Sequence, residues 1–442
     1  MHNLALALHK KGYQVTGSDD EIVEPSKSRL KANGLLPEAV GWFPEKIHLN
    51  LDAVILGMHA RIDNPELIRA QELGLKIYSY PEFLYEQTKN KTRVVIGGSH
   101  GKTTLTSMIM HVLKENQIKF DYMVGSMIEG FDLMVNLEDN NSIAIFEGDE
   151  YLASPIDRRP KFHLYKPKIG LITGIAWDHI NVFPTYDSYV DQFRIFAREI
   201  PHDGVVFYCH KDEELCKIMK EPGIIGERVP YFAPDNHINV DNETIVTDNG
   251  IDYKLTVFGE HNLLNIGGAL QVCMELGVKR ADFFNAIKSF KGAARRMELV
   301  QKTDDFIFFR DFAHSPSKLK ATTAAIKNQY RNKHVLACME LHTFSSLNEE
   351  FLKEYSNSFN DADTAIVYFN PKTIEHKKLK PITPEQVKQA FGREDLVVFT
   401  DSKALESFLK SKPMKSHCLL MMSSGTFDGI DVKRLSSELK LQ

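Results

Sequence analysis

Short runs of apolar residues alternate with longer segments of helical periodicity along most of the chain. Apolar runs without polar alternation are typical of strands buried on both faces, and helices between them are typical of parallel sheets. Because one sheet cannot hold so many strands, the sequence predicts an α/β protein with three domains. The predicted strands are 53–57, 77–80, 94–96, 142–147, 169–173, 306–310, 334–339, 364–368, 396–399 and 418–422.

Two polar stretches, 87–92 and 291–294, have the composition of interdomain hinges. A further segment, 221–256, is rich in Gly, Pro, Asn and Asp and is predicted to form a β-rich insertion. The hinges divide the chain into predicted domains at 1–90, 91–293 and 294–442.

The start of the chain departs from the usual order of elements in such domains. A helical pattern over 2–11 comes first, and residues 13–17 follow as a predicted strand. A doubly wound domain usually opens with a strand and a glycine-rich turn before its first helix. The N-terminal domain is therefore expected to lack its first strand and the glycines after it.

The most informative segment is RVVIGGSHGKTT, residues 93–104. A β-branched run leads into a glycine-rich turn, and an apolar periodic helix follows. Unpaired N–H groups and the helix dipole favour an anion at such a helix start. Lys102 can neutralise the β- and γ-phosphates of a nucleotide, and Thr103 can ligate Mg²⁺.

This segment is two residues tighter than the common phosphate loop, because it reads G-x-x-G-K-T-T. An ordinary strand-to-helix turn that needs glycines is the alternative. The lysine and the hydroxyls at the start of an apolar helix favour a nucleoside triphosphate site. The candidate nucleotide-binding residues here are Gly98, Ser99, His100, Gly101, Lys102, Thr103 and Thr104.

Two further strands end in polar side chains. Glu147 ends the strand 142–147, and the strand 169–173 is followed by a segment that contains His179. The carboxyl ends of parallel strands are where α/β proteins bind ligands. Beside a bound triphosphate, Glu147 is a candidate Mg²⁺ ligand and His179 a candidate metal or phosphate ligand.

Two segments of the second half of the chain also carry candidate site residues. Asn262 and Asn265 share one face of a helix, where an amide can pair with an adenine edge; helix capping by Asn262 is an equal alternative. Arg296 follows a hinge and can reach a triphosphate, although a solvated arginine is the simpler interpretation. Asp311 to Pro316 form a loop after a strand, where Asp311 or Ser315 can also cap the next helix.

Composition narrows the class of protein. The 442 residues are 43% hydrophobic and 26% charged, which is ordinary for a globular protein. A net charge of −5 gives no basic surface for nucleic acid or an anionic membrane, and no apolar run is long enough to span a bilayer. The five scattered cysteines indicate reduced thiols in a cytoplasmic protein.

Together these motifs resemble the Mur ligase family, ATP-dependent amide-bond ligases of bacterial cell-wall synthesis. The G-S-H-G-K-T-T loop, the E-G-D-E carboxylates, the D-H pair, G-x-H-N-x-x-N and R-R-M-E occur in the family's order. The resemblance covers nearly the whole chain. It implies a Rossmann-like N-terminal domain for the UDP-sugar, a central P-loop ATPase domain and a C-terminal Rossmann-like domain for the peptide.

The resemblance also implies roles for the catalytic residues. Lys102 would contact the β- and γ-phosphates, while Thr103 and Glu147 hold one Mg²⁺. His179 would belong to a second Mg²⁺, and Arg296 would lie over the phosphates. ATP and Mg²⁺ are the implied cofactors, and the substrate carboxylate would pass through an acyl phosphate.

The remaining residues are assigned to ligands. Asn262 and Asn265 would lie near the adenine and the phosphates, and Asp311 would approach ATP from the third domain. The candidate substrate-binding residues are Asp19, Arg158, Lys161 and His314.

Within the family, Asp311 to Pro316 is similar to the members that act directly on UDP-N-acetylmuramate. One further stretch resembles the corresponding segment of members that attach the tripeptide L-Ala-γ-D-Glu-meso-diaminopimelate in peptidoglycan recycling. It consists of E-G-D-E-Y, D-R-R-P-K-F and Y-x-P. The alternatives are an L-alanine-adding ligase, a folylpolyglutamate synthase-like ligase and a nucleotide-binding switch without catalysis. No obligate protein partner is expected.

The chain departs from the family pattern in two places. Some members carry a carbamylated lysine after the D-H pair, whereas residues 178–199 contain no lysine, and Arg194 is a candidate replacement cation. The expected loss of the first strand would also remove the glycine-rich loop that meets the UDP diphosphate in the family. Asp19 then remains the candidate residue for binding the nucleotide end of the substrate.

Overall fold

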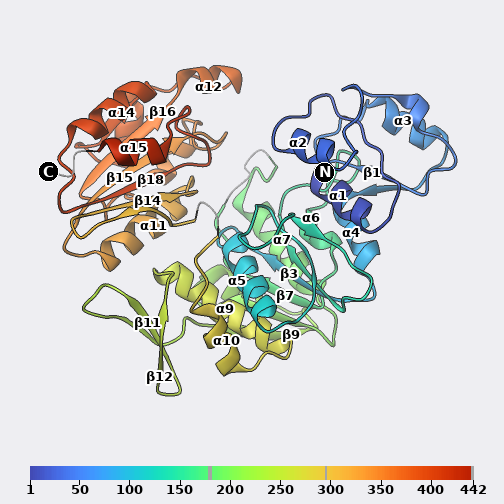
Figure 1. The fold of residues 1–442 in the computed structure, drawn as a ribbon, viewed down its shortest axis with the longest axis horizontal. Coiled ribbons are helices and arrows are strands. Elements are labelled where there is room, and N and C mark those ends of the chain that lie inside the picture. Colours follow the sequence, from blue (N-terminus) through green and yellow to red (C-terminus); the bar gives the residue numbers. More distant parts are fainter. Residues whose placement is uncertain (178–181, 294–295, 440–442) are drawn as a thin grey trace. The chain divides into compact units, whose positions relative to one another are not determined.

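A computed structural model describes residues 1–177, 182–293 and 296–439. The chain forms two compact units, the first from residues 1–232 and 268–280 and the second from 233–267 and 281–442. Each unit is built around parallel β-structure with helices beside it (Figure 1). The predicted α/β class is therefore confirmed.

A seven-stranded sheet forms the centre of the first unit, in the order β5-β4-β6-β3-β7-β8-β9. All neighbours are parallel except β4 and β5. The strands are β3 (Thr92–Gly97), β4 (Asp121–Met123), β5 (Val135–Asn136), β6 (Ile143–Glu147), β7 (Ile169–Ile172), β8 (Val205–Cys209) and β9 (Glu227–Tyr231). The helices after these strands are α5 (Lys102–Glu115), α6 (Lys161–Leu164), α7 (Tyr186–Arg198) and α8 (Glu213–Ile218).

The order of these strands explains where a ligand can bind. The chain leaves β3 towards β4 and leaves β7 towards β8, although β3 and β7 are neighbours. In open α/β sheets a crevice forms at the carboxyl ends of two such strands. Residues in the middle of β3, Val94 to Ile96, are fully buried, as their apolar run predicts.

The first 90 residues belong to the same unit and contain a small two-stranded parallel sheet. The predicted strand at 13–17 is wrong, because only a single bridge between Asp19 and Gly41 forms nearby. Four of these five residues are exposed, and no described strand lies beside them to complete a ladder. The elements are α1 (His2–Lys10), α2 (Ser26–Ala32), η1 (Pro44–Lys46), β1 (Val54–Leu56), α3 (Pro65–Glu72), β2 (Ile77–Ser79) and α4 (Tyr80–Thr88).

The second unit contains a six-stranded sheet in the order β13-β14-β18-β15-β16-β17, antiparallel only at β13. Alternate residues of its inner strands, such as Phe308, Cys338 and Met421, pack with Leu405 and Leu435 from two helices on one face. The strands are β13 (Glu298–Lys302), β14 (Phe306–Asp311), β15 (His334–Leu341), β16 (Thr364–Phe369), β17 (Val397–Phe399) and β18 (His417–Met422). The helices are α11 (Pro316–Gln329), η2 (Phe351–Tyr355), α12 (Pro371–His376), α13 (Pro384–Phe391), α14 (Ser402–Ser411) and α15 (Val432–Glu438).

The predicted β-rich segment 221–256 divides between two sheets. Its first strand, β9, extends the seven-stranded sheet of the first unit. The others form a separate antiparallel sheet in the second unit: β10 (Asn236–Ile238), β11 (Thr244–Asp248) and β12 (Ile251–Leu255). α9 (Glu260–Glu275) and α10 (Arg280–Ile287) follow.

Among the described residues, we find no helix with both the length and the apolar character that crossing a membrane requires.

A buried ion pair lies at the amino-terminal edge of the seven-stranded sheet, where β3 and β4 begin. Lys91 Nζ lies 2.6 Å from Asp121 Oδ2, and the Asp121 side chain is fully buried. Asp121 Oδ1 also accepts from Glu138 N at 2.9 Å and from Asn141 Nδ2 at 2.8 Å. Burial raises the pKa of Asp121, while Lys91 and these donors act in the opposite direction.

We predict that Lys91→Ala lowers the free energy of unfolding by about 3 kcal/mol, because it leaves a buried carboxylate without its counter-charge. Urea unfolding measures this loss. The control is Lys168→Ala, which removes an exposed ion pair with Asp203 and should cost less than about 1 kcal/mol. Equal losses in the two variants would contradict the prediction.

Candidate functional site

In the loop between β3 and α5, only glycine can occupy position 98. Gly98 has φ +122°, and a Cβ there would overlap Thr173 Oγ1 and lie 2.8 Å from Thr173 N. The neighbouring β7 approaches this closely because Ser99 N donates to Gly174 O at 2.9 Å. Gly101 is the N-cap of α5 with φ +74°. The loop is therefore tied to the end of β7, and its helix begins directly after it.

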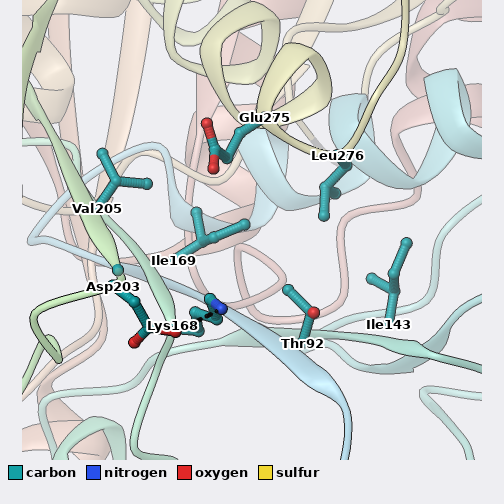
Figure 2. A pocket seen from close by; sticks show the side chains of 9 residues that line it. Thr92, Ile143, Lys168, Ile169, Asp203, Val205, Glu275 and Leu276 are labelled. Carbon is teal, nitrogen blue, oxygen red and sulfur yellow. Dashed lines mark hydrogen bonds and ion pairs between the residues drawn. The ribbon is translucent and has the colours of Figure 1, made fainter.

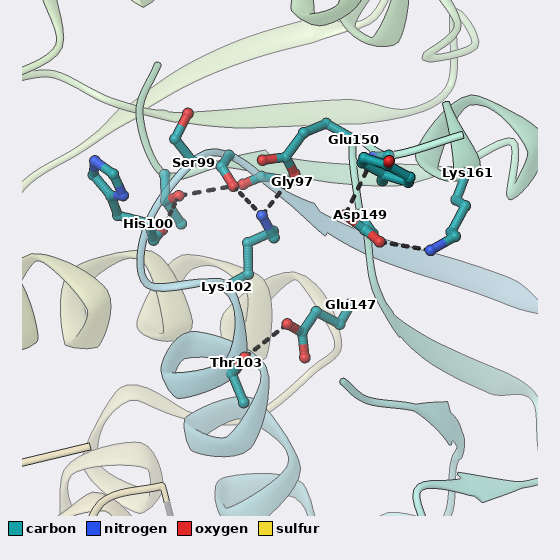
Figure 3. Close-up of polar contacts among 12 residues, drawn as sticks. Gly97, Ser99, His100, Lys102, Thr103, Glu147, Asp149, Glu150 and Lys161 are labelled. Atoms are coloured by element: carbon teal, nitrogen blue, oxygen red, sulfur yellow. Dashed lines mark hydrogen bonds and ion pairs between the residues drawn. The ribbon is translucent and has the colours of Figure 1, made fainter. Parts of the chain in front are cut away.

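Lys102 is the first residue of α5, and its ammonium group turns back towards the loop (Figure 3). Nζ donates to Gly98 O and to Glu150 Oε2, both at 2.6 Å. Burial alone would lower the pKa of Lys102, but the carboxylates of Glu150, Asp149 and Glu147 raise it above its usual value. The lysine is thus a fixed positive charge at the position where a phosphate loop needs one.

Thr103 and Glu147 meet across the ends of α5 and β6. Thr103 Oγ1 donates to Glu147 Oε1 at 2.7 Å, and Glu147 Oε2 accepts from Gly125 N at 2.8 Å. Both side chains are largely buried. A hydroxyl and a carboxylate side by side, next to a phosphate-binding loop, fit the oxygen ligands that Mg²⁺ takes when phosphates complete its shell.

The other residues of the loop are also anchored. Ser99 Oγ accepts from Ala176 N at 2.9 Å, and His100 O accepts from Thr173 Oγ1. Thr104 is buried on the first turn of α5, where its carbonyl accepts from Ser107 Oγ at 2.9 Å. The predicted metal ligand His179 lies outside the described residues.

Two of the three substrate candidates of the first unit lie near the Met1 amino group: burial lowers the pKa of that group, Asp19 raises it and Lys161 lowers it. Lys161, at the start of α6, pairs with Asp149 Oδ2 at 2.6 Å and so lies beside the E-G-D-E carboxylates that follow β6. Arg158 is exposed, and no contact of its side chain is found among the described residues. Asp19 is exposed as well, and its carbonyl accepts from Gly41 N at 2.7 Å.

Arg194, the candidate replacement cation for the family's lysine, is paired with carboxylates. Its guanidinium donates to Glu221 at 2.8 Å and to Asp191 at 2.5 Å, and Glu214 lies 3.7 Å away. These carboxylates neutralise it on the outer face of α7, whereas the residue before it, Phe193, is buried. Arg194 is close in sequence to the position of the family's lysine, but its side chain is paired with these carboxylates.

Two candidate segments of the second unit lie at the start of α9 and at the end of β14. Asn262 and Asn265 are both buried near the start of α9, and Asn262 Nδ2 donates to Phe258 O at 2.8 Å. Asp311 is buried at the end of β14, where it accepts from Met297 N and Ala313 N, both at 2.7 Å.

The alternative of helix capping by Asp311 or Ser315 is wrong. Asp311 bonds to residues outside α11, and Ser315 makes no side-chain cap. The Arg296 guanidinium lies 4.6 Å from the Phe312 ring centre, and His314 Nδ1 lies 2.8 Å from Phe312 O. These residues therefore meet at the carboxyl end of β14.

Sequence reasoning missed two side chains that the structure brings to the loop. Glu150 contacts Lys102, and Tyr189 donates to Glu150 Oε1 at 2.9 Å. The E-G-D-E motif held a signal for Glu150, because a strand end that carries three acids places more than one of them near the ligand. Nothing local marked Tyr189, which lies 39 residues further along the chain.

A cavity of about 270 Å³ lies at the opposite, amino-terminal edge of the same sheet (Figure 2). Thr92, Ile143, Ile169 and Val205, at or near the starts of four strands, contribute to its lining. Lys168 and Asp203 at its rim pair at 2.8 Å. This cavity is separate from the loop, since the loop follows the other ends of these strands.

The described part of the chain contains no group of three or more His, Cys, Asp and Glu side chains placed to hold a metal.

Family comparisons agree with this architecture. The Mur ligase middle domain matches residues 96–273, the "Mur ligase, glutamate ligase domain" matches 295–425, and the "Mur ligase family, catalytic domain" matches 1–92. The chain belongs to the Mur ligase family. Members of this family are ATP-dependent ligases that form amide bonds and release ADP, so the chain is an enzyme of this class.

Individual relatives carry two different names. The UDP-N-acetylmuramate–L-alanine ligase of Caldicellulosiruptor bescii is 32% identical, over 83% of this chain and 80% of the relative. The UDP-N-acetylmuramate–L-alanyl-γ-D-glutamyl-meso-2,6-diaminoheptandioate ligase of Haemophilus influenzae is 26% identical, over 100% of this chain and 97% of the relative. The crystal structure of a murein peptide ligase from Psychrobacter arcticus has a TM-score of 0.66 at 22% identity, covers 100% of this chain and 97% of its own, and shares the fold.

We predict that Gly98→Ala weakens binding of ADP by more than about tenfold, because the new methyl group must push the loop away from Thr173. Isothermal titration measures the affinity. The control is Gly277→Ala, which has a similar φ of +90° but nothing within 4 Å of the added carbon.

The control should lose about 1 kcal/mol of stability to backbone strain and keep its ADP affinity. Normal ADP binding by folded Gly98→Ala would contradict the prediction that this glycine shapes the phosphate site.

Proposed function

We propose that this enzyme joins the tripeptide L-Ala-γ-D-Glu-meso-diaminopimelate to UDP-N-acetylmuramate with hydrolysis of ATP to ADP. The meeting of Lys102, Thr103 and Glu147 at adjacent strand ends supports the use of ATP. The likeness to the Haemophilus relative over the whole chain supports the choice of the tripeptide. The E-G-D-E-Y and D-R-R-P-K-F stretch points in the same direction.

The proposed chemistry proceeds in two steps. A muramoyl carboxylate oxygen attacks the γ-phosphorus of ATP, the bond to the bridging oxygen breaks, and ADP leaves. The tripeptide's α-amine then attacks the acyl phosphate carbonyl, loses a proton and expels inorganic phosphate. Because a free carboxylate is a poor acyl donor, phosphorylation supplies the leaving group. The protein's part is positioning and charge neutralisation.

Roles for the loop residues follow from their positions. Lys102 would neutralise the β- and γ-phosphates, and the backbone of Gly98 to Thr104 would surround them. Thr103 and Glu147 would hold Mg²⁺. For His179, which lies outside the described residues, a role at a second ion is proposed from the family resemblance alone. When bound, Mg²⁺ would neutralise the charge that develops on the phosphoryl oxygens.

The remaining candidates are assigned by domain. We assign residues 1–90 to the UDP-sugar with Asp19, 91–293 to ATP, and 294–442 to the peptide. Asn262, Asn265, Arg296 and Asp311 would contact the nucleotide. Arg158, Lys161 and His314 would contact the substrates, and the exposed guanidinium of Arg158 suits a peptide carboxylate.

L-Alanine is the second candidate for the amine substrate. The supporting observation is the 32% identity to the L-alanine ligase of Caldicellulosiruptor bescii. The two candidates share every step of the chemistry and differ only in the amine that attacks the acyl phosphate.

One ADP-release assay separates these candidates. With ATP, Mg²⁺ and UDP-N-acetylmuramate present, we expect the tripeptide to give a kcat/KM at least about tenfold above that of L-alanine. The reverse preference would assign the protein to L-alanine addition. Turnover with folate and glutamate instead, or ATP hydrolysis that neither substrate changes, would contradict both candidates.

We predict that Lys102→Ala lowers kcat by at least about a hundredfold, because the phosphoryl charge loses its fixed counter-charge. The ADP-release assay measures turnover, and circular dichroism checks the fold. Lys168→Ala, which removes a lysine from the other edge of the sheet, should keep normal turnover. Near-normal activity of Lys102→Ala would remove the phosphate-loop assignment.

A further inference from the structure

The two oxygens of Glu150 have different partners, and one of these partners is the ammonium group of Lys102. Oε2 lies 2.6 Å from Lys102 Nζ, and Oε1 accepts from the Tyr189 hydroxyl at 2.9 Å. The side chain is 1% exposed, so water does not screen its charge. Each oxygen therefore accepts a hydrogen bond from a donor that the fold holds in place.

Tyr189 is held rigidly on α7. Its side chain is fully buried, with ring centres of Phe183 and Phe193 at 5.4 and 5.2 Å. The hydroxyl oxygen lies 2.8 Å from Ser99 Oγ, and Ser99 Oγ accepts from Ala176 N at 2.9 Å. When Tyr189 donates to Glu150, the Ser99 hydroxyl donates to Tyr189. A chain of hydrogen bonds thus runs from the end of β7 through the loop to the carboxylate.

Lys102 is the residue on which Glu150 acts. An ammonium group can donate three hydrogen bonds, and Gly98 O and Glu150 Oε2 each accept one of them from Lys102. A phosphate bound in the loop would be attracted to the same ammonium group that Glu150 already partly neutralises. The carboxylate therefore fixes the ammonium in place and, at the same time, reduces the net attraction of the loop for an anion.

We propose that Glu150 is a positioning residue that acts through Lys102 and tunes how tightly the loop holds a di- or triphosphate. Its charge weakens the hold on the nucleotide and thereby favours ADP release after turnover. Tyr189 supports this role, because its hydroxyl satisfies the buried carboxylate when Lys102 turns towards phosphate. The inference rests on the nucleotide-binding part of the proposed function and not on the choice of amine substrate.

The test is nucleotide affinity, measured by isothermal titration with Mg²⁺ and either ADP or a non-hydrolysable ATP analogue. Glu150→Gln keeps the size and polarity of the side chain but removes its charge. We expect this variant to bind both nucleotides about tenfold more tightly. AMP lacks the phosphates that Lys102 reaches, so its affinity should change less than about twofold. A merely structural role would weaken all three ligands together.

Tyr189→Phe gives a second, opposite expectation. Without the hydroxyl, Glu150 depends more strongly on Lys102, so ADP should bind about threefold more weakly. In the Glu150→Gln background the same substitution should have a smaller effect on ADP affinity, because the part of the effect that depends on the carboxylate charge is removed and the part that depends on the contact with Ser99 remains. Asp203→Asn is the matched control, since it removes a lysine-paired carboxylate from the other edge of the sheet and should leave affinity unchanged.

ADP affinity of Glu150→Gln that is equal to or weaker than that of the unmodified protein would overturn the inference. An effect of Tyr189→Phe that is equally large in the Glu150→Gln background would do the same. Failure of the proposed ligation is a separate result, because the unmodified protein would then bind ADP but show no turnover with the tripeptide. If ADP does not bind at all, both the inference and the phosphate-loop assignment fail.

Discussion

The candidate site depends on one buried charge, the ammonium group of Lys102, and on the carboxylates that balance it. A lysine so poorly exposed to water would be costly without partners. Glu150 supplies the direct contact, and the ends of β3 and β6 are adjacent in the sheet, which brings the acids of the E-G-D-E motif to the start of α5. The parallel pairing of these two strands therefore brings together the side chains that we propose for ATP binding.

The second constraint is the close approach of the loop to β7. Thr173 bonds to the carbonyls of Gly97 and His100, and Gly98 leaves no room for a side chain between them. The loop is consequently held in place by the fold itself, so little conformational entropy would be lost on binding of the phosphates that we propose for it. The same contacts carry the Ser99–Tyr189–Glu150 chain, which links the geometry of the loop to the charge of Lys102.

Much of this arrangement could be predicted from the sequence, because apolar runs and a glycine-rich turn are local signals. The strands at 142–147 and 169–173 form where expected, and Glu147 lies beside Thr103. The strand predicted at 13–17 does not form, since an apolar pattern cannot report whether a neighbouring strand is present. Arg194 and Tyr189 show the same limit, because their contacts join helices and loops that are distant in the sequence.

The most direct measurement of the central claim is a crystal structure with a non-hydrolysable ATP analogue and Mg²⁺. The account predicts β- and γ-phosphates against the backbone of residues 98–103, with Lys102 in contact and the metal held by Thr103 and Glu147. A triphosphate bound elsewhere, for instance in the cavity beside Lys168, or a Glu147 carboxylate turned away from the metal, would contradict it.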